Sequence, residues 1–160
     1  MKLCSPGKAT NSAFTLVEVL IVVLIMAVLA AVVVQQQTAS TNDAKIALVQ
    51  QHLSAMKNQI ELQKALHGSY PLEIEADWFA GGIPKHPFND GSVPDIHVLA
   101  TFPDRQHPQY KIIDQFGAYW YNPKNGMIRA RIPNQRTTAK TLAAYNYIHN
   151  SKLTLLSQTN

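Results

Sequence analysis

The chain has 160 residues, which suits one modest domain with an appendage rather than two domains with separate cores. Apolar residues make up 46% of it, yet its mean hydropathy is only −0.09, so they must be concentrated in one segment. The net charge is +4, and the single cysteine, Cys4, excludes a fold held by disulfides and a site built from several thiolates.

The first element is an apolar run of 21 residues, 14–34, whose only polar members are Thr15 and Glu18. As a helix it would be about 31 Å long, which matches the hydrocarbon core of a bilayer and exceeds the apolar part of a secretory signal peptide. We therefore expect a transmembrane helix over residues 14–34. Lys2 and Lys8 precede it without any acid, which predicts a cytoplasmic N-terminus.

Glu18 is an acid inside this run, where an ionised carboxylate costs about 2.5–3.5 kcal/mol. It could lie near the membrane interface, or it could pair with a cation of another subunit. Cleavage just before Phe14 would create an α-amine with a pKa of about 7.7–8.0, which is largely protonated at neutral pH. Such an ion pair in a packed bundle would set the axial register between neighbouring subunits.

The sequence Ala13-Phe14-Thr15-Leu16-Val17-Glu18, followed by residues 19–24, resembles the type III signal of type IV prepilins and pseudopilins. This resemblance implies that a prepilin peptidase removes the leader 1–13 between Ala13 and Phe14, that Phe14 is N-methylated, and that Glu18 directs assembly. Ala13 stands where the family usually has Gly. Ala27 and Gln35 stand where many members have a Gly and a Pro.

Residues 35–67 contain no Pro or Gly, so the helix is expected to continue through them. Apolar residues recur there at spacings of three and four, namely Ile46, Val49, Leu53, Met56 and Ile60. This pattern predicts an amphipathic continuation of the helix that packs on a small sheet; a coiled coil is the alternative. The helix should end near His67-Gly68, where Gly can adopt the left-handed conformation.

Two segments after the helix, Gly68-Ser69-Tyr70-Pro71 and Pro84-Lys85-His86-Pro87-Phe88, resemble the major pseudopilins of type II secretion systems. Residues 90–108 are expected to form a loop. Calcium is conceivable there, because related pseudopilins hold it in acidic loops. However, the acids and histidines of the loop lack regular ligand spacing, and we expect solvated charges and no cofactor. These residues are Asp90, Asp95, His97, Asp104 and His107.

The last part of the chain predicts short strands and a terminal helix. Residues 110–113 suggest one strand, and residues 118–121 and 127–132 suggest a hairpin around the Asn-Gly of residues 125–126. Alternation places Ile128, Ala130 and Ile132 inward, and Arg129 and Arg131 in water. Apolar residues at helical spacing predict a helix over residues 138–149. The predicted fold is α+β, with the long helix packed on a small antiparallel sheet, as in pilins.

Basic residues dominate from Lys111 onward, with Asp114 as the one acid. This bias suits an acidic partner or nucleic acid, but a solvated face is the preferred interpretation, and nucleic acid is not expected. No catalytic motif is present in the sequence, so an enzyme is not expected.

The resemblance implies a structural subunit of a type II secretion-like pseudopilus in the inner membrane, with residues 68–160 forming a periplasmic α/β region. Its implied partners are further copies, other pseudopilins, the prepilin peptidase, the inner-membrane assembly platform and membrane lipids. The alternatives are a subunit of a type IV pilus or DNA-uptake filament, a membrane-tethered enzyme, and an unprocessed single-span adaptor.

Overall fold

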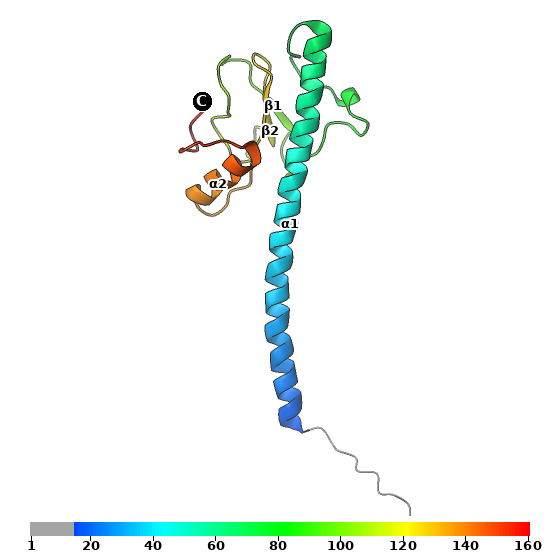
Figure 1. Cartoon of the computed structure of the whole chain (residues 1–160), viewed down its shortest axis with the longest axis vertical. Helices are drawn as coiled ribbons and strands as arrows, with labels where there is room; N and C mark the ends of the chain where they lie inside the picture. Colours follow the sequence, from blue (N-terminus) through cyan, green and yellow to red (C-terminus); the bar gives the residue numbers. More distant parts are fainter. Residues whose placement is uncertain (1–14) are drawn as a thin grey trace, which may run out of the picture. The chain divides into compact units, whose positions relative to one another are not determined.

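The computed structural model describes residues 15–160, and the side chains of residues 15–31 and 41–160. The elements in chain order are α1 (Leu16–His67), the short 3-10 helix η1 (Ala76–Trp78), β1 (Ile96–Val98), β2 (Tyr119–Asn122), β3 (Met127–Ala130) and α2 (Thr138–His149) (Figure 1). The chain divides into two compact units, an N-terminal unit of residues 1–41 and a C-terminal unit of residues 42–160. Helix α1 contributes residues to both.

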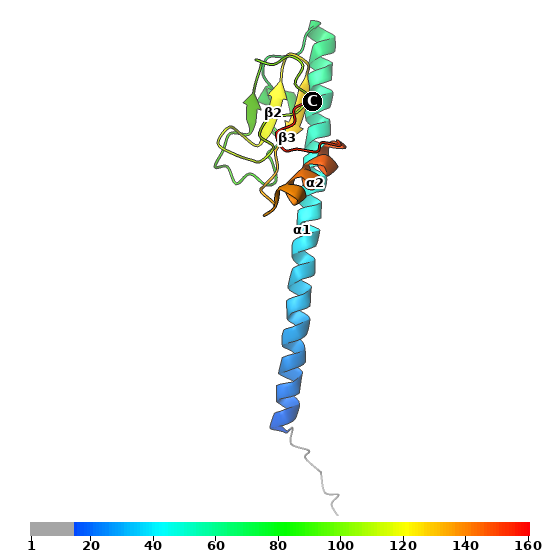
Figure 2. The same ribbon diagram turned by 90° about the vertical axis from the view of Figure 1, so that its left-hand side faces the viewer.

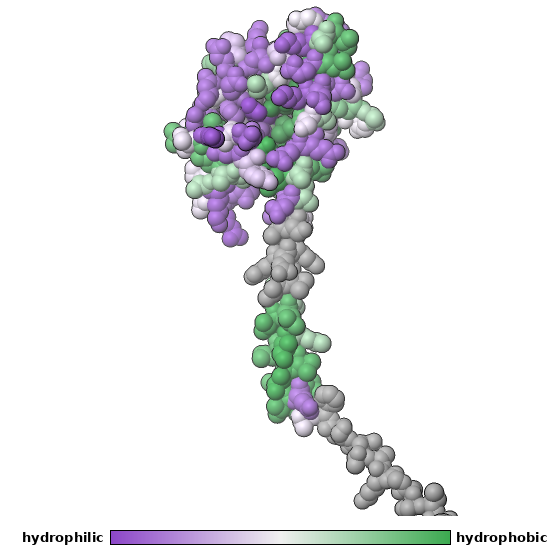
Figure 3. Space-filling view, in the orientation of Figure 1, coloured by the Kyte–Doolittle hydropathy of each residue, from purple (hydrophilic) through white to green (hydrophobic). Residues whose placement is uncertain are grey.

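The described part of the N-terminal unit is the start of α1, and its apolar side chains are exposed. Leu16 is 81% exposed and Leu24 64%, and Figure 3 shows this stretch as an apolar surface. Among the residues described, no helix combines the length and the apolarity needed to cross a membrane. The predicted span of residues 14–34 includes Phe14 and residues 32–34, whose side chains lie outside the described part, and it stays a prediction.

The C-terminal unit begins with residues 42–67 of α1, whose apolar seam is buried as predicted. Val49, Met56 and Ile60 are completely buried, and Ile46 and Leu53 pack against the same core. The helix ends where expected, because Gly68 has φ +77° and its backbone N–H donates to the carbonyl oxygen of Lys64 (2.8 Å). This hydrogen bond satisfies one of the carbonyls left open at a helix C-terminus.

The sheet has the order β1-β2-β3 and is mixed, so the prediction of an antiparallel sheet is wrong for one of its two pairings. Strands β2 and β3 form the predicted hairpin, with Tyr119 opposite Ala130. Strand β1 pairs in parallel with β2, with Ile96 opposite Tyr119, although it lies in a segment expected to be loop. The strand predicted at residues 110–113 is reduced to an isolated bridge between Ile112 and Ile132.

The core lies between α1 and the sheet, and α2 closes it. Figure 2 shows β2 and β3 side by side next to α1. All four residues of β2 are buried, and Tyr145 and Ile148 of α2 join the same apolar cluster. Helix α2 has the predicted bounds: the Thr137 hydroxyl accepts a hydrogen bond from the backbone N–H of Lys140, and Asn150 ends the helix in the left-handed conformation.

The outer face of the hairpin is covered rather than solvated, so the prediction that Arg129 and Arg131 face water is wrong. Arg131 is 1% exposed. Its Nε donates to the carbonyl oxygen of Tyr110 (2.9 Å), and the Nε of Arg129 donates to that of Gln106 (3.1 Å). The segment of residues 105–117 therefore forms a second layer over the sheet. The inward assignment of Ile128, Ala130 and Ile132 is confirmed, since all three are buried.

Candidate processing and assembly site

The predicted assembly residue, Glu18, lies in the first turn of α1 and forms a capping box with Thr15. The Glu18 carboxylate accepts hydrogen bonds from the backbone N–H and the hydroxyl of Thr15, both at 3.2 Å. In return, the Thr15 hydroxyl accepts a hydrogen bond from the backbone N–H of Glu18 (3.3 Å). Two of the N–H groups that a helix start leaves without partners are thus satisfied reciprocally.

This geometry fixes the direction of the Glu18 side chain. The carboxylate is held at the N-terminal end of α1, where the helix dipole favours a negative charge. It is exposed and open to a cation from another molecule. Ala13 and Phe14, the predicted processing residues, lie outside the described residues. The role of Thr15 was missed from the sequence, although the spacing Thr-x-x-Glu before an apolar run is the signal that identifies a capping box.

A second group of motif residues fixes the far end of α1. The Lys64 ammonium donates to the Tyr70 hydroxyl (2.9 Å) and lies 4.1 Å from the centre of its ring. The Tyr121 hydroxyl of β2 donates to the carbonyl oxygen of Pro71 (2.8 Å). The segment Gly68-Ser69-Tyr70-Pro71 therefore ties the end of the helix to the hairpin.

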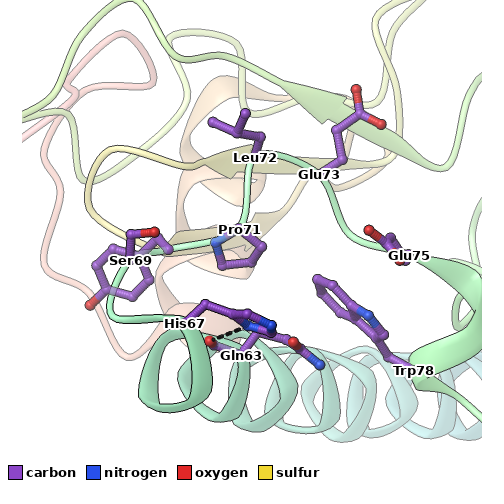
Figure 4. A pocket seen from close by; sticks show the side chains of 9 residues that line it. Gln63, His67, Ser69, Pro71, Leu72, Glu73, Glu75 and Trp78 are labelled. Atoms are coloured by element: carbon purple, nitrogen blue, oxygen red, sulfur yellow. Dashed lines mark hydrogen bonds between the residues drawn. The ribbon is translucent and has the colours of Figure 1, made fainter.

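Beside this turn lies a pocket of about 460 Å³, which we call the acidic pocket. In Figure 4 the Trp78 and Pro71 rings lie on opposite sides of the hollow, with Gln63 and His67 of α1 below them. Glu73 and Glu75 supply two exposed carboxylates, and none of the nine described lining residues is Lys or Arg. The remaining lining residues are Ser69, Tyr70 and Leu72.

The acids and histidines that had suggested calcium do not gather at one place. Asp90 accepts a hydrogen bond from the backbone N–H of Ser92 (2.9 Å). His97 contacts Arg131, and His107 contacts the Tyr145 hydroxyl. In the part of the chain that the structure describes, no group of three or more His, Cys, Asp or Glu side chains could hold a metal ion.

Three cations of the basic C-terminal half are held inside the C-terminal unit. The Lys111 ammonium donates to the carbonyl oxygens of Pro108, Leu156 and Gln158, and burial lowers its pKa to about 8. The Arg131 guanidinium pairs with Asp114 at 3.3 Å. Together with Arg129, these cations support loops through backbone carbonyls, which is a structural rather than a ligand-binding arrangement.

Comparison with known protein families gives one match. Residues 8–34 match the model of the prokaryotic N-terminal methylation motif, which includes Ala13, Phe14 and Glu18. Neither the curated proteins nor the solved structures gave a match. The motif is the signal of type IV pilin-like prepilins, so it implies processing by a prepilin peptidase, a membrane-anchored N-terminal segment and pilin-type filament assembly.

Proposed function

We propose that the chain is a structural subunit of a type II secretion-like pseudopilus and serves as its major subunit. The peptidase cuts between Ala13 and Phe14, Phe14 is methylated, and the mature chains assemble from the inner membrane into a periplasmic filament that supports protein export. The observation that carries this proposal is the methylation motif at residues 8–34, within which the helix Leu16–His67 begins and from there leads into a small α+β unit. The role is mechanical and needs neither a catalytic residue nor a cofactor.

The first turn of α1 supports the assembly step. Glu18 is oriented by Thr15 at the helix start, where the new α-amine of a neighbouring copy could reach it. The exposed apolar side chains of residues 16–31 would lie in lipid before assembly and against neighbouring helices afterwards. The pairing of Glu18 with a cation then selects one axial register, because a charge left unpaired in an apolar bundle is costly.

The choice of a pseudopilus rests on the two segments that resemble major pseudopilins. Tyr70 and Pro71 of the first segment bond to α1 and β2. His86 of the second segment is buried, and its ring centre lies 4.8 Å from that of Tyr119. Both motifs therefore contribute to the packing of the C-terminal unit instead of forming loops of arbitrary sequence.

Mass spectrometry of the mature N-terminus tests the processing step. We expect a chain that begins with N-methylated Phe14 in cells that contain the peptidase. An intact Met1 in those cells would refute the proposal. Glu18→Ala should leave the protein in the membrane but abolish filaments, while Glu61→Ala, which removes an exposed acid further along α1, should assemble normally.

Four exposed cations favour a DNA-uptake filament as a second candidate; they are Lys124, Arg136, Lys140 and Lys152. A filament that binds DNA through them would lose affinity steeply as salt rises, because each neutralised phosphate releases counterions. Titration of labelled DNA with the purified full-length chain at two salt concentrations decides between the candidates. Salt-sensitive binding that weakens in Lys140→Ala would favour DNA uptake, and no binding would favour the pseudopilus.

A further inference from the structure

We propose that the acidic pocket at the end of α1 binds Arg136 and Lys140 of a second copy of this chain, so that copies join end to end. The inference rests on the proposed function, because a filament needs a contact that every subunit repeats. It adds to the proposed function the two surfaces that form this contact and the residues that make it.

The acidic pocket has the chemistry to receive a basic side chain. Glu75 provides a carboxylate beside the hollow, and Glu73 provides a second one at its rim that points away from Pro71 and Trp78 (Figure 4). The half-buried Trp78 provides an aromatic face against which a guanidinium or an alkyl stem can pack. Lys64, near the end of α1, is held by the Tyr70 hydroxyl and ring, and it forms no ion pair with these carboxylates.

The start of α2 carries two cations in an unfavourable setting. Arg136 is exposed and has φ +64°, a left-handed conformation that costs a non-glycine residue about 1–2 kcal/mol. Lys140 lies in the first turn of α2, which contains no acid. Cations at a helix N-terminus oppose the helix dipole, whereas an anion placed there is stabilised. Carboxylates from another molecule would therefore offset the repulsion between Lys140 and the helix dipole.

Neither set of charges is neutralised by an ion pair within the part of the chain that the structure describes. Over the residues that the structure describes, one salt bridge forms, between Arg131 and Asp114. Glu73, Glu75, Arg136 and Lys140 take part in no ion pair there, and all four are exposed.

The two surfaces lie at opposite ends of the C-terminal unit. A groove lined by Asp43, Ala47 and Gln50 of α1 and by Ala143 and Tyr147 places α2 beside the start of the helical segment 42–67. The acidic pocket is lined by Gln63 and His67, which are near its end. The 13 residues from position 50 to position 63 (63 − 50) correspond to about 20 Å of helix. Figures 1 and 2 both show α2 beginning on the side away from the end of α1.

This separation decides the kind of assembly. A contact between two different surfaces is heterologous, and when the surfaces face in opposite directions it continues as an open filament instead of closing into a dimer. The proposed contact is thus compatible with a filament of many copies, and it is formed outside the apolar packing of residues 16–31.

Charge exchange in the full-length chain tests the contact. We expect that Glu73→Lys with Glu75→Lys lowers the yield of filaments by about tenfold or more, and that Arg136→Glu with Lys140→Glu does the same, since like charges then face each other. The chain with all four substitutions should recover filaments, because the charges are exchanged but remain complementary. Lys124→Glu, which reverses an exposed cation in the β2–β3 turn, is the matched control and should assemble normally.

Cross-linking tests the contact directly and does not depend on filament yield. The native chain has one cysteine, Cys4, in the leader that processing would remove. A chain with Glu75→Cys and Arg136→Cys, treated with a short bifunctional maleimide, should give a ladder of multimers. Mixed single variants should give only dimers that contain one of each. Dimers of Glu75→Cys with itself would indicate a two-fold contact and overturn the proposal.

The outcomes separate this inference from the proposed function. Normal filaments from both charge-reversed variants, together with no filaments from Glu18→Ala, would overturn the contact and leave the pseudopilus proposal standing. A chain with an unprocessed N-terminus that never forms filaments would overturn both. The fourfold exchange could also fail to restore filaments to the charge-reversed chains. If the cysteine variants then give no ladder of cross-linked multimers, the two results together contradict the inference, even where one variant folds poorly.

Discussion

Lys111 is a buried ammonium whose hydrogen-bond partners are all backbone carbonyls. Its Nζ lies 3.1 Å from the oxygen of Pro108, 2.7 Å from that of Leu156 and 2.5 Å from that of Gln158. A charge in this setting ties the C-terminal residues to the loop at 108, in a unit that contains no cysteine. Replacing it removes the donor and leaves three acceptors facing an apolar group.

We therefore predict that Lys111→Met lowers the free energy of unfolding by about 2–4 kcal/mol, because buried acceptors without donors carry a desolvation penalty. The C-terminal segment should also become sensitive to protease. Thermal unfolding and limited proteolysis of the purified chain measure the two effects. Lys152→Met, at an exposed lysine of the same segment, is the control. Equal stability of the two variants would contradict the role given to Lys111.

Gly126 is a second position where one residue decides local packing. It has φ +71°, and a Cβ there would overlap Cε1 of the Tyr70 ring. Tyr70 is held by Lys64, so the ring cannot simply move aside. We predict that Gly126→Ala destabilises the C-terminal unit by more than about 1 kcal/mol. Gly81→Ala, at a position with open space and no positive φ, should change the melting temperature little. A stable Gly126→Ala variant would show that Tyr70 is not fixed.

At the scale of elements, helix α1 depends on its buried seam in the C-terminal unit. Met56 is completely buried, whereas Leu66 on the same helix is 67% exposed. We predict that Met56→Ala costs about 2–5 kcal/mol of stability through lost apolar burial and the cavity left behind. Leu66→Ala should stay within about 0.5 kcal/mol. Denaturant unfolding followed by circular dichroism measures both. Similar losses in the two variants would mean that the seam does not support the core.

The elements that the sequence could predict are those with a local signal. The seam of Val49, Met56 and Ile60 has helical spacing, Gly68 is a typical helix terminator, and the Asn-Gly of residues 125–126 is a typical hairpin turn. Each signal lies within a few residues of the element that it specifies. The Thr-x-x-Glu spacing of Thr15 and Glu18 at the candidate assembly site is a local signal of the same kind, and it predicts the capping box.

The elements that the sequence could not predict depend on contacts between distant segments. Residues Ile96–Val98 form strand β1 because they pair with Tyr119–Tyr121. A strand of three residues is too short to show a periodic pattern that would predict this pairing. The burial of Arg131 depends on the segment that covers the hairpin, while the alternation rule assumes one solvated face. The pocket formed by Gln63, Glu73 and Trp78 likewise exists only after the chain has turned back along α1.

At the scale of the whole molecule, three histidines of the C-terminal unit are buried or half-buried, namely His86, His107 and His149. Burial lowers the pKa of His86 to about 4 and, together with Arg129 and Lys111, lowers that of His107 to about 4. The pKa of His149 falls to about 3, mainly through burial and also through Arg129. His86 packs against Tyr119 of the hairpin, His107 lies in the segment 105–117 and contacts Tyr145 of α2, and His149 contacts the carbonyl oxygen of Ala130. Their protonation therefore affects the packing of the whole C-terminal unit.

The pH dependence of stability follows from the sign of these shifts. Well above pH 6.5 the three histidines are neutral in both the folded and the unfolded chain and contribute no slope. As the pH falls below 6.5, the unfolded chain binds protons that the folded chain does not bind until about pH 4 or 3. Stability is therefore lost across this window, at about 1.4 kcal/mol per pKa unit for each histidine.

We predict that the melting temperature of the full-length chain falls steadily as the pH is lowered from 6.5 to 4. The near-ultraviolet circular dichroism of the buried Trp120 is a suitable probe, since its signal depends on fixed packing. His107→Gln should reduce the number of protons taken up on unfolding in this window by about one, and so make the fall less steep. A melting temperature that stays constant down to pH 4.5 would mean that these histidines titrate normally, and the burial argument would fail.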